Sequence, residues 1–134
     1  MLATMDAAQA IGDLTEISPQ VRHVVVLGAD GAPGGSNLPD DASAQRLADG
    51  ARRLLEAAEE LRPEVAQLEA ATPAGSVFVV RDGDRVIAAT TTPEPTVGLV
   101  FYDLKTCLRS IEAEAPKPKR RTAKKKEEGD DAAA

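Results

Sequence analysis

The chain has 134 residues and a net charge of −6, with 43% hydrophobic but only 2% aromatic residues. This length corresponds to one domain, whose core must be built from Leu, Val, Ile and Ala. The single cysteine excludes a disulfide framework and a cysteine-based zinc site, and the single histidine leaves little material for acid–base or metal chemistry. No stretch approaches the roughly 20 apolar residues of a membrane span, and the N-terminus lacks a signal-peptide pattern. We therefore expect a cytoplasmic protein that is not an enzyme and uses no cofactor or metal.

A first helix is predicted from Met5 to Ile17, because apolar residues recur there at three- and four-residue spacing. Either Met1 or Met5 is the true start of the chain. Ser18-Pro19 ends the helix, since the residue before a proline is disfavoured in the helical region. The β-branched segment Val21–Leu27 is predicted to be a strand that is apolar on both faces, so we expect His23 to lie in the core or in an interface. One face of this strand is expected to carry Val21, His23, Val25 and Leu27.

Glycine and proline dominate the next segment. Asp30-Gly31 is typical of a two-residue turn, and the following Pro33–Leu38 is predicted to be a short strand at a sheet edge. The alternative, a phosphate-binding loop, is disfavoured because the G-x-x-x-x-G-K-[ST] pattern is absent and no lysine is near.

A long helix is predicted from Asp41 to Arg62, with Asp40 or Asp41 as its N-cap. Its apolar stripe covers about half of the circumference, which is wider than a helix on one sheet requires. Gly50 inside the helix indicates close backbone packing at that position. The stripe consists of Ala44, Leu47, Ala48, Ala51, Leu54, Leu55, Ala58 and Leu61.

The second half of the chain contains a clear hairpin. Residues 65–72 are compatible with either a helix or a strand, and they lead into strands over Ser76–Arg81 and Arg85–Thr91. We predict Asp82-Gly83 as the two-residue loop, with Arg81 opposite Asp84 and Phe78 opposite Ile87.

A last helix is predicted from Val97 to Glu112, because apolar residues again recur at helical spacing. Asp103 is expected to face away from the core. Cys107 lies beside the apolar stripe and is expected to be a small buried hydrophobe, not a reactive thiol.

Strands that are apolar on both sides require cover on both sides. We therefore predict an α+β domain over residues 5–112, with an antiparallel sheet, the long helix on one face and the other two helices on the opposite face. Residues 113–134 have no apolar side chain larger than Ala and are predicted to form a disordered tail.

The order of these elements resembles the Roadblock family of dynein light-chain type, in its prokaryotic, bacterial branch. The similarity rests on the strand 23–27 with its Ala29–Ala32 turn, the long Ala/Leu/Arg/Glu helix, the hairpin over 77–91 and the Val97–Val100 opening of the last helix. Longin-like and profilin-like domains share parts of this layout. The glycines at 28, 34 and 35 make the second strand poorer than the family pattern.

The resemblance implies a five-stranded antiparallel sheet in the order α-β-β-α-β-β-β-α and favours a strand over residues 65–71. It also implies a homodimer in which that edge strand and the long helix meet their copies across a two-fold axis. The candidate interface residues are Leu47, Gly50, Ala51, Leu54, Ala58, Leu61, Val65, Gln67 and Glu69.

The function implied by the resemblance is that of a non-enzymatic adaptor or scaffold for a Ras-like small GTPase or a related signalling partner. Candidate partner-binding residues on the long helix are Arg46, Asp49, Arg53, Glu56 and Glu60. An arginine finger among Arg46, Arg52, Arg53 and Arg62 is less favoured than a solvated helix face paired with neighbouring acids. Preferential binding of one GTPase conformation is the preferred mechanism.

The C-terminal tail supports an alternative function. Its basic residues precede an acidic block and are suited to non-specific contact with nucleic acid or another acidic surface, so a nucleic-acid-associated scaffold is the second hypothesis. The basic residues of the tail are Lys117, Lys119, Arg120, Arg121, Lys124, Lys125 and Lys126.

Overall fold

The computed structural model describes residues 6–111, so the start of the chain and the tail over 113–134 lie outside the described residues. The elements are α1 (Ala7–Ile17), β1 (Val21–Leu27), β2 (Pro33–Ser36), α2 (Asp41–Leu61), β3 (Gln67–Thr72), β4 (Gly75–Asp82), β5 (Arg85–Thr91) and α3 (Val97–Ser110). The predicted order of elements is confirmed, and the ambiguous segment after α2 is a strand.

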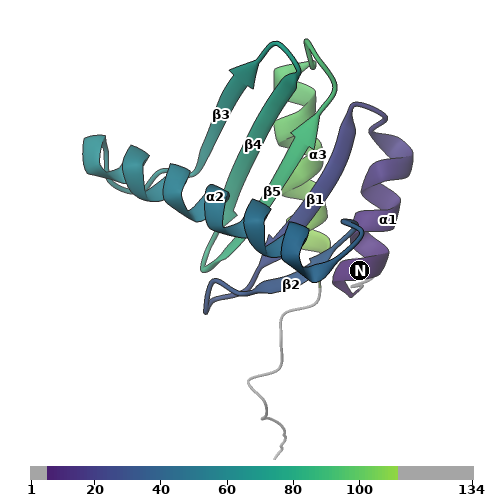
Figure 1. Ribbon diagram of the computed structural model, residues 1–134, viewed down its shortest axis with the longest axis horizontal. Coiled ribbons are helices and arrows are strands. Elements are labelled where there is room, and N and C mark those ends of the chain that lie inside the picture. The colour runs from purple at the N-terminus through teal and green to yellow at the C-terminus, as the bar shows by residue number, and fades with distance from the viewer. Residues whose placement is uncertain (1–5, 112–134) are drawn as a thin grey trace, which may run out of the picture.

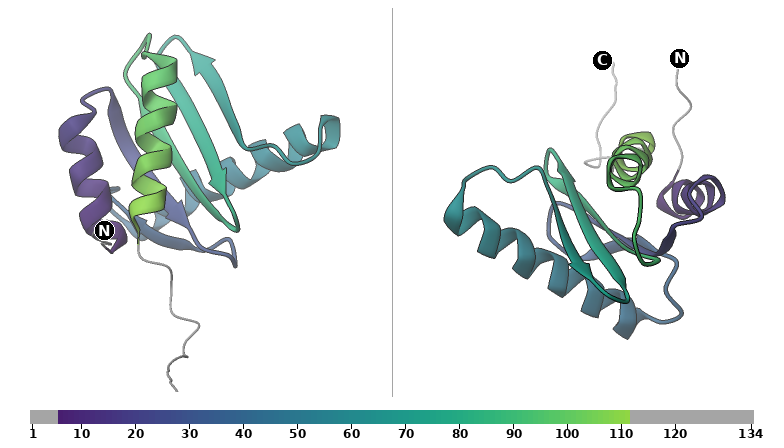
Figure 2. Two further views of the ribbon diagram at one scale, coloured as in Figure 1. Left: turned by 180° about the vertical axis from the view of Figure 1, so that it is seen from behind. Right: turned by 90° about the horizontal axis from the view of Figure 1, so that it is seen from above.

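The five strands form one antiparallel sheet in the order β2-β1-β5-β4-β3. Helix α2 crosses one face of this sheet, while α1 and α3 lie side by side on the other (Figures 1 and 2). The fold is therefore the three-layer α+β arrangement that the two-faced strands predict.

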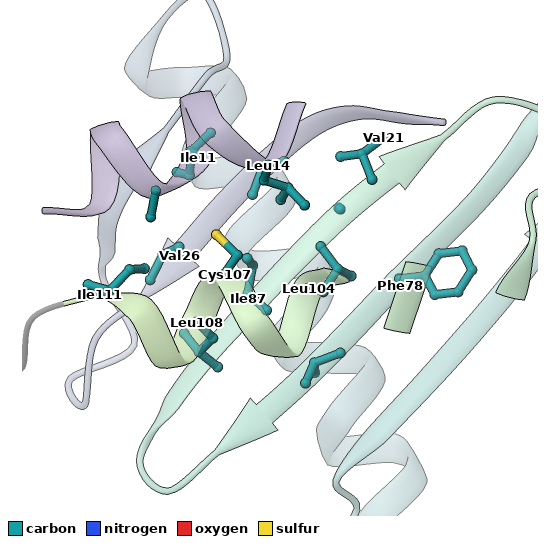
Figure 3. Close-up of a cluster of buried hydrophobic side chains, with 14 of the residues drawn as sticks. Ile11, Leu14, Val21, Val26, Phe78, Ile87, Leu104, Cys107, Leu108 and Ile111 are labelled. Carbon is teal, nitrogen blue, oxygen red and sulfur yellow. The ribbon is translucent and has the colours of Figure 1, made fainter. Parts of the chain in front are cut away.

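Each face of the sheet has its own hydrophobic core. Beneath α1 and α3 the core is closed by large side chains such as Phe78, Leu104 and Leu108, all 0% exposed (Figure 3). Beneath α2 it is built from smaller ones, with Ala48 and Ala51 of the helix against Val25, Val79 and others of the strands. The small residues of α2 allow this helix to approach the sheet closely.

Two of the helices have an aspartate as their N-cap residue. Asp6 accepts a hydrogen bond from the Gln9 N–H at 2.8 Å, and Asp40 accepts one from the Ser43 N–H at 2.7 Å. The bond from the Ser43 backbone also lowers the pKa of Asp40. These bonds satisfy N–H groups that the first turn of a helix leaves without a partner. Of the two candidate caps for the long helix, Asp40 is the one used.

The hairpin register differs from the prediction. Asp82 pairs with Arg85 and Val80 with Ile87, so the two loop residues are Gly83 and Asp84 instead of Asp82 and Gly83. Gly83 has φ +67° and Asp84 is not among the residues with positive φ, a pattern that suits a turn with glycine at its first central position. The predicted pairs were wrong by two residues, and because side chains alternate with period two, every side chain stays on its predicted face.

Strand β1 also departs from its predicted alternation. The register with β5 shifts between Val21 and His23, where a bulge rotates the start of the strand. Val21 consequently joins the core beneath α1 and α3, and His23 is exposed. The expectation of His23 in the core was wrong, since strict alternation does not hold across a bulge, while its alternative place in an interface stays a prediction.

Three further residues differ from expectation, including Ile17, whose helical spacing placed it on the apolar face of the first helix. Asp103 is only 9% exposed because α1 packs along the flank of α3 that carries it. Ile17, at the last turn of α1, is 67% exposed and lies outside the core cluster. A Cβ at Gly50 meets no atom within 4 Å, so this glycine makes no close backbone contact within the described chain.

Two glycines at opposite ends of β4 allow a matched test of the close backbone contact at Gly75. A Cβ on Gly75, whose φ is +137°, overlaps the carbonyl of Thr91, whereas a Cβ on Gly83 meets only open space. Gly83→Ala is expected to cost about 1 kcal/mol of unfolding free energy through backbone strain alone. Gly75→Ala adds a steric conflict of roughly 1–3 kcal/mol and is expected to be clearly worse. Urea unfolding of both variants measures the difference, and equal losses contradict the geometry.

Candidate protein-interaction site

Strand β3 leaves one side of the sheet open. In the sheet formed by residues 6–111 it pairs only with β4. The N–H of Arg81 donates to the carbonyl of Ala66 at 2.8 Å, so Ala66 and every second residue after it direct their backbone groups toward β4. Because antiparallel bonding alternates, Gln67, Glu69 and Ala71 direct their backbone groups away from β4. This row of backbone donors and acceptors is available to a further strand.

The apolar surface between α2 and β3 is incompletely covered. Helix α2 packs chiefly on β1, β2 and β5. Near the opposite edge, Leu54 of α2, Leu68 of β3 and Val77 of β4 are only partly buried. Leu61 in the last turn of α2 is 83% exposed. Because Leu68 belongs to β3 and Val77 to its neighbour β4, the edge of β3 and this apolar strip together form a surface suited to a protein partner.

The residues expected at a dimer interface fall into different environments. Leu47, Leu54 and Val65 are partly buried beside the core under α2. Gly50 and Ala58 of α2 are also partly buried, and so is Glu69, which lies opposite Phe78. Leu61 and Gln67 are exposed, while Ala51 is 1% exposed and belongs to the core of its own chain. Sequence reasoning did not select Ala71, although the period-two alternation of a strand would have placed it with Gln67 and Glu69.

The charged side of α2 faces solvent. Arg46, Arg53, Glu56 and Glu60 are exposed. Asp49 is instead engaged within the helix, where it accepts hydrogen bonds from Gln45 at 2.9 Å and from Arg52. Both bonds lower the pKa of Asp49, and the bond from Gln45 has the larger effect.

One ion pair connects α2 with the sheet. Glu59 of α2 accepts a hydrogen bond from Arg81 of β4, and both side chains are 30% exposed. Exposed pairs of this kind contribute on the order of 0–1 kcal/mol. The pair therefore fixes the orientation of the end of α2 more than it stabilises the fold.

The glycine-rich segment forms a hairpin loop, as predicted, but Asp30-Gly31 is not its two-residue turn. The Gly31 N–H donates to the Gly28 carbonyl at 2.9 Å, which places Ala29 and Asp30 at the centre of the turn. Gly31 has φ +81°, the Gly28 N–H donates to the Ala32 carbonyl at 3.1 Å, and the Asp30 carboxylate accepts from the Ala32 N–H at 3.0 Å. These bonds occupy the N–H groups of Gly28 and Ala32 within the turn itself.

Other kinds of site find little support in residues 6–111. That part of the chain contains no group of three His, Cys, Asp or Glu side chains able to hold a metal ion. None of its helices is long and apolar enough to cross a membrane.

Cys107 is a buried thiol of α3, which confirms its predicted role as a small hydrophobe. It is 6% exposed. Burial, assisted by the negative charge of Asp13, raises the pKa of the thiol to about 11. A thiol with so high a pKa is almost entirely protonated at neutral pH and is a poor nucleophile.

Comparison with solved structures identifies the fold, whereas no family model and no curated protein matches the sequence. A Roadblock/LC7 domain from Streptomyces avermitilis superposes with a TM-score of 0.68 at 19% identity, covering 79% of this chain and 94% of that one. MglB from Myxococcus xanthus gives a TM-score of 0.61 at 15% identity, covering 78% and 89% of the two chains. A profilin in a complex titled LokiProfilin1/Rabbit Actin gives 0.57 at 13% identity, covering 80% and 96%. The chain therefore has the Roadblock/LC7 fold, and the profilin match reflects the same layering.

The protonation of Cys107 gives a prediction. Raising the thiol pKa from its ordinary 9.0 to about 11 lowers the thiolate fraction at pH 8 by about a hundredfold. Iodoacetamide at pH 8 should therefore alkylate the folded chain at least about a hundredfold more slowly than the chain unfolded in urea. Since the folded state holds this proton more tightly, the thiol also lowers the unfolding free energy as pH rises from 9 towards 11. Similar alkylation rates for folded and unfolded chains would contradict this assignment.

Proposed function

We propose that the protein is a homodimeric, non-enzymatic adaptor that binds a Ras-like small GTPase or a related signalling partner. The observation that carries the dimer is the open edge of β3 beside a partly bare apolar strip. In the proposed dimer, β3 pairs with β3 of the second copy, so the two sheets become continuous. The α2 helices then lie next to each other, and Leu54, Leu61 and Leu68 leave water.

Physical chemistry supports this arrangement over an isolated monomer. Exposed edge strands with free backbone groups invite pairing with another chain, and natural proteins protect them. The other edge, β2, is only four residues long and contains Pro33, Gly34 and Gly35, which make it a poor template. Strand β3 has six residues and no proline, so it is the edge suited to self-association.

The proposal of a GTPase partner rests on the fold shared with MglB and on the family resemblance in the sequence. The exposed charges of α2, which include Arg46, Arg53 and Glu56, supply a surface on which charge complementarity can select a partner. We propose that binding biases the GTPase toward one conformation, because a partner with unequal affinity for two states shifts their populations. This mechanism requires no catalytic side chain from the adaptor.

The dimer can be tested at the β3 edge. Glu69→Pro removes an outward N–H without removing a bond to β4, and proline is tolerated at sheet edges. We expect this variant to be monomeric at micromolar concentration by light scattering, whereas the wild-type chain is dimeric. Glu69→Ala is the matched control, since it loses the carboxylate that accepts from Ser76 at 2.7 Å but keeps the N–H. A monomeric wild-type chain, or a Glu69→Pro variant that remains dimeric, overturns the proposed interface.

The GTPase partner can be tested separately. Immobilised full-length protein is mixed with extract of its native cells containing either GDP or a non-hydrolysable GTP analogue. We expect a Ras-like small GTPase to be retained preferentially in one nucleotide state. Arg46→Glu with Arg53→Glu should reduce its retention by about tenfold, equivalent to roughly 1.4 kcal/mol.

The matched control reverses two exposed charges away from α2, Arg22→Glu on β1 and Lys105→Glu on α3. This variant should retain the GTPase normally. If the wild-type dimer retains no small GTPase in either nucleotide state, the partner class is wrong, while the dimer interface is unaffected by that result.

A further inference from the structure

A groove runs between α1 and α3, on the face of the sheet opposite α2. The two helices run antiparallel, so the end of α3 lies beside the beginning of α1 (Figure 2). The groove has a volume of about 290 Å³. Its apolar lining includes Ala10, Leu14 and Ile17, and the side chain of Ile17 is 67% exposed. An apolar groove with such an exposed rim is suited to an occupant that also has apolar surface.

The charge of this groove is negative. Asp13 and Glu16 of α1 line it from one side, and Asp103 of α3 lines it from the other. No Lys or Arg is among the described residues that line the groove, and within residues 6–111 none of the three carboxylates forms an ion pair. Asp103 is only 9% exposed. The groove therefore favours an occupant that combines positive charge with aliphatic length.

The same chain contains such an occupant close by. The described chain ends at Ile111, directly after α3, and Ser110 lines the groove. Residues 112–116 separate this point from Lys117, Lys119, Arg120 and Arg121. Five extended residues reach about 17 Å. The distance along α3 from Ser110 back to Asp103 is only about 10 Å. The basic cluster is thus tethered within reach of the entire groove.

We propose that the segment Lys117–Arg121 docks into the α1–α3 groove of its own chain. The alkyl parts of its Lys and Arg side chains contact Ala10, Leu14 and Ile17, while the charged groups pair with Asp13, Glu16 and Asp103. Single exposed ion pairs are weak, but several act together here, and a short tether supplies an effective concentration in the millimolar range. The docked state holds the basic cluster against its own domain and masks its charge from other acidic surfaces.

Nuclear magnetic resonance of the ¹⁵N-labelled full chain tests the tail side. Substitution of Lys117, Lys119, Arg120 and Arg121 by Gln should shift the amide signals of Asp13, Asp103 and Thr106. Substitution of Lys124, Lys125 and Lys126 by Gln is the control, because these residues lie beyond the docking segment. Raising the salt from 0.1 M to 1 M shortens the screening length from about 10 Å to about 3 Å, and should produce the same shifts in the wild-type chain.

The groove side is tested by charge reversal. Asp13→Lys with Glu16→Lys alters two exposed residues and should raise the mobility of residues 117–121 in the heteronuclear NOE to that of residues 124–126. Glu56→Lys with Glu60→Lys makes the same change in net charge on α2 and should leave the tail unchanged. A thermal melt confirms that both variants remain folded.

Three results would overturn the proposal. The first is a wild-type segment 117–121 as mobile as residues 124–126 at 0.1 M salt. The second is an equal response to the groove variant and the α2 variant, which indicates only a general attraction to an acidic domain. The third is transfer of a spin-label effect from the tail of one copy to the groove of another in a mixed sample, which assigns docking to a second copy.

Discussion

The central constraint on this structure is a sheet that must be kept from water on both faces. Three consecutive residues of β1, Val24 to Val26, are each at most 3% exposed, and Phe78 to Val80 of β4 are fully buried. Alternating side chains make such runs point into both layers. A helix on only one face would leave half of these side chains in water, so α2 and the α1–α3 pair are both obligatory.

The uneven division of three helices between two faces explains the candidate interaction site. Helix α2 runs across the strands and packs chiefly on β1, β2 and β5, whereas α1 and α3 lie side by side on the opposite face (Figure 1). On the face of α2 the apolar surface near β3 and β4 is therefore incompletely covered, and Leu68 and Val77 are only partly buried there. The second copy proposed here supplies the missing cover.

The surface proposed for a second copy and the groove proposed for the chain's own tail lie on opposite faces of the sheet and differ in character. The β3 edge and the adjoining strip use backbone groups and aliphatic side chains, and association there depends weakly on salt. The groove between α1 and α3 is acidic, with Asp13, Glu16 and Asp103 in its walls, so the proposed docking there should depend strongly on salt. The two associations can therefore be separated by ionic strength alone.

The sequence by itself determined the order of the elements, the face that most side chains occupy and the hydrophobic role of Cys107, because periodicity, proline, glycine and capping residues act over a few positions. It determined neither the hairpin register nor the exposure of His23, since both depend on which residue of a neighbouring strand lies opposite. The burial of Asp103 and the partial cover of Leu54 likewise arise only when helices pack against each other and the sheet. The open edge of β3 is likewise decided only by the tertiary structure, because an edge depends on the order of the strands in space, which local patterns do not encode.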